Sequence, residues 1–200
     1  MKFLRNLLKP KSQTVVVVSG LPRSGTSMMM KMLEAGGLEV LTDHIRTPNE
    51  DNPKGYYEFE RVKKLPDGDV AWLPEAQGRV VKIISALLKH LPPTHTYKVL
   101  FMRRRMSEIL ASQQQMLVRR GEATDKVSDE EMTRLFEKHL EETFAWMAQQ
   151  PNLTCLEVDY NAMLADPRPQ VAQLQAFLDM DLDTQAMLAV VDPELYRQRA

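Results

Sequence analysis

Cysteine, excess charge and long apolar segments are all scarce in this 200-residue sequence. The single cysteine, Cys155, excludes an intrachain disulfide, and its apolar neighbours predict a small buried side chain in a reducing compartment. The 26 Lys and Arg residues nearly balance the 27 Asp and Glu residues, which argues against a nucleic-acid partner. No apolar run approaches the roughly 18 residues that a membrane span needs. The sequence thus predicts a soluble, cytoplasmic protein without an integral membrane segment.

Metal-ligating residues are also few. Only 4 histidines accompany the one cysteine, and no spacing of His, Cys and carboxylate residues resembles a ligand set, so we expect no metal. A chain of this length with 44% hydrophobic residues can bury one substantial core, which predicts a single domain over residues 1–200. Nothing in the sequence indicates an oligomeric state.

Apolar segments of two kinds alternate along the chain. Short runs that suit buried strands lie at residues 14–19, 80–84, 98–102 and 154–158. Helical spacing predicts helices at residues 27–35, from 106 to near 121, from 128 onward, and 170–178. The helix that starts at the capping box 128–131 is expected to turn Met132, Leu135, Phe136, Leu140 and Met147 inward. Alternating strands and helices predict a three-layer α/β fold, a central parallel sheet with helices on both faces.

The most informative segment is the loop after the first predicted strand. Four consecutive valines lead toward Gly20, and Gly25 precedes the first helix, so the chain can turn tightly there. Thr26 and Ser27 place hydroxyl groups beside the N–H groups that begin the helix. Such an arrangement binds phosphate and makes the predicted fold P-loop-like. Thr26 stands where the nucleotide-triphosphatase motif has lysine, and Arg23 carries the positive charge instead.

This loop resembles the 5′-phosphosulfate loop of the sulfotransferases, usually Pro-Lys/Arg-Ser-Gly-Thr-Thr/Ser. Here its residues are Pro22, Arg23, Ser24, Gly25, Thr26 and Ser27, the arginine form that bacterial and tyrosylprotein sulfotransferases share. The resemblance implies an enzyme that moves a sulfuryl group from 3′-phosphoadenosine 5′-phosphosulfate (PAPS) to a hydroxyl or amine by in-line displacement. It also implies that the loop binds the 5′-phosphate and that Arg23 stabilises charge on the transferred group.

A second segment, from Lys98 to Ser112, is similar to the 3′-phosphate motif of the same family, a strand ending in arginine with a serine eight residues later. Arg104 and Ser112 have that spacing. The resemblance implies that these two residues bind the 3′-phosphate. Three consecutive arginines, residues 103–105, also stand at the start of a predicted helix, where the helix dipole disfavours cations unless an anion is present.

The second predicted strand matches the family only in part. Many cytosolic sulfotransferases have Lys-Thr-His-Leu-Pro there, with the lysine touching the transferred group and the histidine acting as general base. The corresponding residues here are Lys82, Ile83 and Ile84, so the resemblance implies a catalytic lysine but no histidine. The base must then come from the segment 42–78, where His44 and Glu58 are the candidates.

A third segment, residues 156–167, resembles the strand and helix that follow in bacterial sulfotransferases, and we interpret it as structural. Two other functions are consistent with the phosphate loop. One is a P-loop kinase or NTPase, with Asp159 holding Mg²⁺ at the end of its strand. The other is a non-catalytic protein that binds a nucleotide or 3′-phosphoadenosine 5′-phosphate (PAP). For the enzyme, a small-molecule or peptide acceptor is expected, and the sequence does not say which.

Overall fold

The computed structural model describes residues 14–43, 45, 55–124 and 127–191. Its four strands are β1 (Thr14–Gly20), β2 (Val80–Lys82), β3 (Thr96–Arg103) and β4 (Leu153–Asp159). They form one parallel sheet in the order β2-β1-β3-β4, which confirms the predicted sheet. The second strand is shorter than predicted, since a 3₁₀ helix begins at Ser85 and the side chain of Ile84 is exposed.

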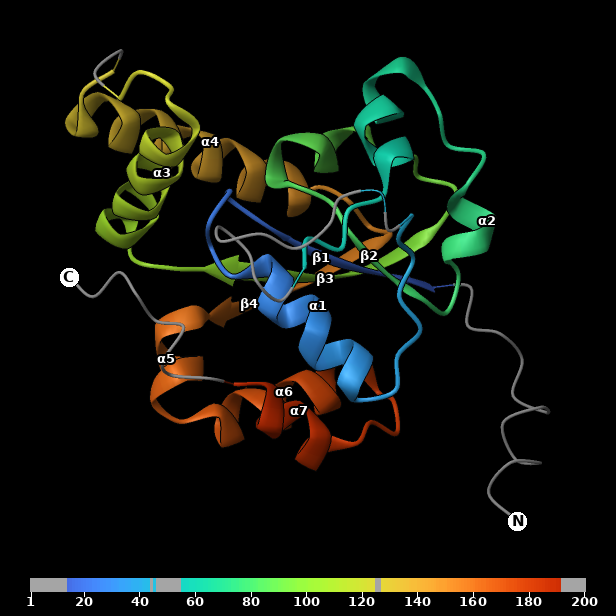
Figure 1. The fold of residues 1–200 in the computed structure, drawn as a ribbon. Coiled ribbons are helices and arrows are strands. Elements are labelled where there is room, and N and C mark those ends of the chain that lie inside the picture. The colour runs from blue at the N-terminus through green and yellow to red at the C-terminus, as the bar shows by residue number, and fades with distance from the viewer. Residues whose placement is uncertain (1–13, 44, 46–54, 125–126, 192–200) are drawn as a thin grey trace.

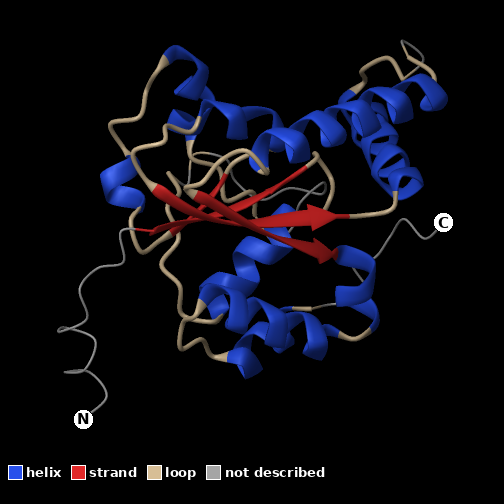
Figure 2. Ribbon diagram, turned by 180° about the vertical axis from the view of Figure 1, so that it is seen from behind, coloured by secondary structure: helices blue, strands red, loops and turns tan. Residues whose placement is uncertain are grey.

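Helices cover both faces of this sheet (Figures 1 and 2). One face carries α1 (Thr26–Ala35), α5 (Tyr160–Ala165), α6 (Pro167–Leu178) and α7 (Thr184–Val190). The other face carries the 3₁₀ helices η1 (Glu60–Asp67) and η2 (Ser85–His90), with α2 (Leu73–Ala76) and α4 (Asp129–Met147). The helix α3 (Met106–Arg120) leaves the carboxyl end of β3 and packs beside α4. The predicted three-layer α/β fold is therefore confirmed.

The core divides into two hydrophobic clusters, one on each face of the sheet. Val15 and Val17 of β1 belong to the cluster beneath α4 and η2, whereas Val16 and Val18 belong to the cluster beneath α1 and α6. All four valines are fully buried. A strand covered on both faces has no reason to alternate apolar with polar residues, which explains the unbroken run of valines.

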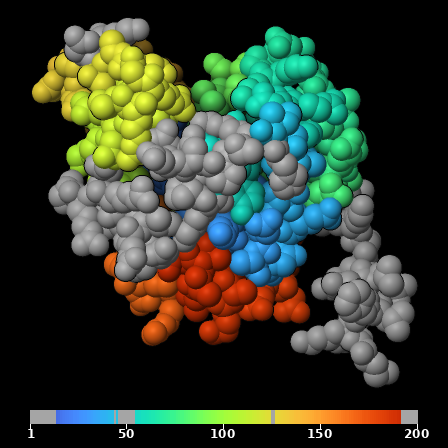
Figure 3. All heavy atoms as spheres, viewed as in Figure 1, coloured from blue at the N-terminus to red at the C-terminus, as the bar shows by residue number. Residues whose placement is uncertain are grey.

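The helix α4 begins as predicted. Its N-cap hydroxyl, on Ser128, accepts a hydrogen bond from the Glu131 N–H at 3.2 Å. Leu140 and Met147 are buried as expected, but the prediction for Leu135 is wrong because its side chain is half-exposed. The first half of α4 projects beyond the sheet together with α3, so it has little protein to pack against (Figure 1). In the space-filling view α3 forms a bulge separate from that of η1 (Figure 3).

The long segment 42–78 contains short helices and no strand among its described residues, as its prolines and glycines predict. Cys155, on β4, is only partly buried, yet burial raises the pKa of its thiol to about 12. None of the helices in the described part of the chain is both long and apolar enough to cross a membrane.

Candidate active site

The loop between β1 and α1 depends on two glycines. Gly20 has φ +146°, and a Cβ there would lie 2.8 Å from the Met102 carbonyl oxygen of β3. Gly25 has φ +101°, and its Cβ would lie 2.4 Å from the Tyr160 ring. Both positions combine a backbone conformation that L side chains rarely adopt with contacts too close for a methyl group. The loop is therefore tightly enclosed by β3 on one side and by the start of α5 on the other.

Within the loop, side chains divide between holding its shape and lining its surface. The Ser24 hydroxyl is fully buried and donates to the Leu21 carbonyl at 2.7 Å, which fixes the turn. Pro22 is exposed, and Thr26 and Ser27 are partly buried at the start of α1. The N-cap residue of α1 is Gly25, which has no side chain with which to cap the start of the helix.

Arg23 connects the loop to α3. Its Nε donates to the Ser112 hydroxyl at 2.9 Å, across 89 residues of sequence. Its backbone has φ +69°, an uncommon conformation for arginine. The structure thus places a residue of the predicted 5′-phosphate loop in contact with a residue of the predicted 3′-phosphate motif.

Arg104 approaches the same loop from the end of β3. Its Nη1 donates to the Arg23 carbonyl at 3.0 Å, and its Nε donates to Glu108 Oε2 at 2.9 Å. The guanidinium carbon lies 4.7 Å from the centroid of the Tyr160 ring. With only 8% of its side chain exposed, Arg104 is held firmly against the loop.

Sequence analysis missed the partners of Arg104. The Glu108 side chain is fully buried, and its Oε1 accepts a hydrogen bond from Asn161 Nδ2 at 2.8 Å. The spacing of four residues between Arg104 and Glu108, which allows a helical ion pair, was one signal that could have found this carboxylate. Tyr160 and Asn161 lie in the segment that the sequence analysis interpreted as structural.

The other two arginines have different surroundings. Arg103 pairs with Glu157 of β4 at 3.0 Å, and both side chains are exposed. Arg105 is 62% exposed and lies 3.7 Å from Glu108 Oε1. Protein carboxylates therefore supply part of the negative charge that the three arginines were expected to draw from a ligand. Of the three, Arg104 donates to the loop, through its bond to the Arg23 carbonyl.

Lys82 and Glu58 lie on the opposite side of β1. Lys82 ends β2, pairs in register with Val18, and donates through Nζ to the Tyr56 carbonyl. The Glu58 carbonyl accepts the Thr42 hydroxyl at 2.8 Å, and its carboxylate, 20% exposed, lies 3.7 Å from Lys63 Nζ. Segment 56–58 is thus brought to the end of β2.

The other predicted base, His44, lies outside the described residues. Asp159, the metal ligand of the kinase alternative, instead caps α5, since its Oδ1 accepts the Asn161 and Ala162 N–H groups at 2.7 and 3.0 Å. No group of three or more His, Cys, Asp or Glu side chains that could hold a metal is found among the described residues.

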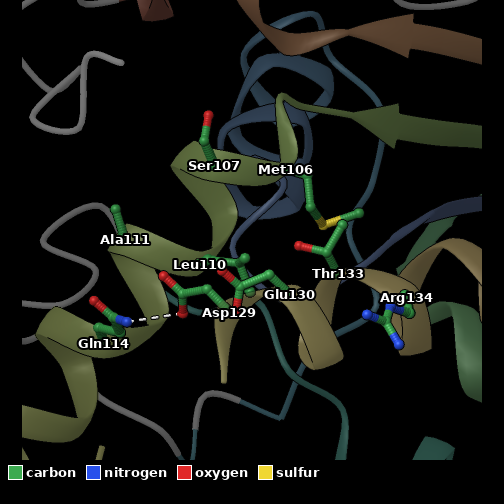
Figure 4. Close-up of a pocket in the computed structure, with 9 residues that line it drawn as sticks. All are labelled: Met106, Ser107, Leu110, Ala111, Gln114, Asp129, Glu130, Thr133 and Arg134. Carbon is green, nitrogen blue, oxygen red and sulfur yellow. Dashed lines mark hydrogen bonds between the residues drawn. The ribbon is translucent and has the colours of Figure 1, made fainter. Parts of the chain in front are cut away.

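Two hollows lie near the carboxyl end of β3. A cavity of about 180 Å³ is lined by Leu21, both Arg103 and Arg104, and Glu137 among others. A wider cleft of about 640 Å³ lies between α3 and α4, where the Gln114 amide donates to Asp129 at 2.9 Å (Figure 4). Met106 lines both hollows.

A model of the sulfotransferase family matches residues 56–184. The chain belongs to the sulfotransferase family. The matched range includes Lys82, Arg104, Glu108 and Ser112, and it begins after the phosphate loop. No curated protein matches the sequence.

Solved sulfotransferases share the fold of this chain. Sulfotransferase STF1 from Mycobacterium tuberculosis has 19% identity and a TM-score of 0.56, with 98% of this chain and 78% of that chain covered. The sulfotransferase domain of the Synechococcus PCC 7002 olefin synthase has 16% identity and a TM-score of 0.51, covering 96% and 86%. A sulfotransferase domain from the curacin biosynthetic pathway has 13% identity and a TM-score of 0.50, covering 90% and 78%.

The family assignment decides between the alternatives that the sequence left open. This sulfotransferase has the P-loop-like α/β fold, and its family uses PAPS as the sulfuryl donor. Neither the kinase nor the non-catalytic alternative gains support from the comparisons. The contacts of Arg23 and Arg104 lie at the carboxyl ends of β1 and β3, which makes this edge of the sheet the candidate active site.

Proposed function

We propose that the chain binds PAPS across the β1 loop and the start of α3, and transfers its sulfuryl group to a hydroxyl or amine of a small-molecule or peptide acceptor. The bond from Arg23 to Ser112 is the observation that carries this proposal, because it joins the two phosphate-binding motifs in one site. With its single cysteine, the protein suits a reducing compartment such as the cytoplasm.

The surroundings of the loop fit an adenosine nucleotide with two phosphate-bearing ends. The loop leads directly into the N-terminus of α1, where backbone N–H groups favour an anion, so residues Pro22 to Ser27 hold the 5′-phosphate. Arg104 and Ser112 hold the 3′-phosphate, where a guanidinium can donate two parallel bonds. PAPS supplies the sulfuryl group and leaves as PAP.

Positive charge at the carboxyl ends of β1 and β2 serves the transfer itself. Arg23 and Lys82 stabilise charge that develops on the bridging and sulfuryl oxygens, which is the main task of a protein in such an in-line displacement. Lys82 is held near the end of its strand by the Tyr56 carbonyl, so its ammonium group is oriented before ligands bind.

The acceptor needs a general base, and Ile84 replaces the family histidine. Glu58 is the proposed base, because the loop contacts with Thr42 bring its segment to the same end of the sheet as Lys82. His44 is the alternative candidate.

Thermal stabilisation by nucleotides tests this function. PAP is expected to raise the melting temperature, whereas ADP, ATP with Mg²⁺, and adenosine 5′-phosphosulfate at equal concentration raise it less. Stabilisation mainly by ATP with Mg²⁺ would contradict the proposal and favour a kinase. Labelled PAPS with a panel of phenols, alcohols, amines and tyrosine peptides then tests turnover. Binding of PAP without transfer to any acceptor class would favour the non-catalytic alternative.

A further inference from the structure

We propose that Glu108 is a positioning residue, which holds Arg104 in the orientation that binds the 3′-phosphate, and that Tyr160 and Asn161 complete this support. The inference rests on the proposed function, since it takes Arg104 as the 3′-phosphate ligand. The inference assigns a role in donor recognition to the buried carboxylate of Glu108 and to the start of α5, which follows β4.

Glu108 is satisfied on both carboxylate oxygens. Oε2 accepts from Arg104 Nε at 2.9 Å, and Oε1 accepts from Asn161 Nδ2 at 2.8 Å, while Arg105 lies 3.7 Å from Oε1. None of the Glu108 side chain is exposed. A charged group in such a place is costly unless it is paired and hydrogen-bonded, so these contacts account for its burial.

Together the contacts fix both the in-plane orientation and the tilt of the Arg104 guanidinium. Its bonds to Glu108 and to the Arg23 carbonyl set the orientation within the guanidinium plane. The Tyr160 ring, 4.7 Å from the guanidinium carbon, sets the tilt of that plane. A cation held in this way loses little conformational freedom when it binds a phosphate, which favours affinity.

The same contacts join three elements that are remote in sequence. Asn161 of α5 donates to Glu108 of α3, and its Oδ1 accepts the Arg105 N–H at 3.3 Å. The Tyr160 ring also packs against Gly25 of the phosphate loop. A shift of α5 would therefore move both Arg104 and the loop.

Neutralising Glu108 changes PAP affinity in opposite directions, depending on whether Glu108 acts only through its charge or by positioning Arg104. A carboxylate near a phosphate site repels the phosphate, so its removal raises PAP affinity if charge alone matters. If Glu108 positions Arg104, its removal lowers PAP affinity, because the guanidinium loses a hydrogen-bond partner that orients it. Misplacement of a binding group by about 1 Å is enough to weaken binding strongly. The direction of the change separates the two roles.

The test compares Glu108→Gln with Glu157→Gln, which makes the same chemical change in the exposed ion pair of the neighbouring Arg103. Dissociation constants for PAP and for adenosine 5′-phosphosulfate are measured by calorimetry, and folding is checked by melting temperature. We expect Glu108→Gln to weaken PAP about tenfold and the 5′-phosphosulfate less than twofold. Glu157→Gln is expected to change neither. Combining Glu108→Gln with Arg104→Ala should weaken PAP no further than Arg104→Ala alone.

Glu108→Asp keeps both charges but shortens the side chain by one methylene, and it serves if the glutamine variant does not fold. It should also weaken PAP selectively. Unchanged or tighter PAP binding in a folded variant, or equal losses for both ligands, would overturn the positioning role. If the unmodified protein itself fails to prefer PAP over the 5′-phosphosulfate, the 3′-phosphate site and the inference built on it are both wrong.

Discussion

The two sides of β1 are built differently at their carboxyl ends. On the β3 side, bonds between side chains join Arg23 to Ser112 and Arg104 to Glu108, and Arg104 also donates to the Arg23 carbonyl. On the β2 side, Lys82 and Glu58 are placed chiefly through backbone carbonyls of the segment 42–78.

Under the proposed function, the donor binds on the β3 side and the acceptor on the β2 side. Side-chain bonds between remote elements fix a site for one ligand shape, which suits a donor that is the same for the whole family. A long segment with little regular structure can change its sequence without disturbing the core, which suits acceptors that differ between members. Substitutions on the β3 side should therefore alter donor affinity, and those on the β2 side should alter turnover.

The largest expected effect is that of Glu58→Gln. If Glu58 is the general base, turnover should fall by about 10² to 10⁴, since a general base contributes that much, while PAP affinity stays unchanged. Steady-state kinetics with labelled PAPS and calorimetry with PAP check both parts. Glu60→Gln is the matched control, because Glu60 pairs with the same Lys63 at 2.6 Å and is exposed. A loss of less than threefold in the Glu58 variant would transfer the role to His44.

The second largest effect is expected for Lys82→Met. Its turnover should fall about 100-fold, because a positive group near the developing charge is lost. PAP affinity should change less than threefold. Lys98→Met is the control, since Lys98 also lies in a strand of the sheet and donates to a backbone carbonyl, that of Leu178, at 2.8 Å. A fall in PAP affinity as large as the fall in turnover would place Lys82 in the donor site instead.

Arg104→Ala should weaken PAP about ten- to a hundredfold, because roughly 1.5 to 3 kcal/mol of charge-assisted hydrogen bonding is lost. Adenosine 5′-phosphosulfate lacks the 3′-phosphate and should bind almost as before. Arg103→Ala, next to it in sequence but paired with Glu157 on the surface, should leave both affinities unchanged. Calorimetry with both nucleotides measures the effect, and equal losses for them would contradict the assignment.

The smallest expected effect is on stability, and it separates the cost of a steric clash at the phosphate loop from the cost of backbone strain alone. Gly25→Ala and Gly68→Ala both place a side chain at positive φ, which costs about 1 kcal/mol of unfolding free energy. Only at Gly25 does the new Cβ meet a neighbour, the Tyr160 ring. Urea unfolding should therefore show Gly25→Ala to be less stable by a further 1 to 2 kcal/mol or so. Equal losses would mean that the loop moves freely away from α5.

Much of the fold was predictable because its signals are local. Four valines at β1, the glycines that follow, and the Ser128 cap each act within a few residues of themselves. The orientation of Leu135 was mispredicted for the opposite reason, since helical spacing marks an apolar stripe but does not say whether another element covers it.

The strand–loop–helix, the arginine in that loop, and the spacing of Arg104 and Ser112 can all be read from the amino-acid order alone. The bond from Arg23 to Ser112 across 89 residues, and the position of Arg104 between Glu108 and Tyr160, arise from the folding of the whole chain. These contacts depend on the order of strands in the sheet, which sets β3 beside β1 and β4 beside β3. Strand order follows from packing of the whole chain, so no short pattern records it.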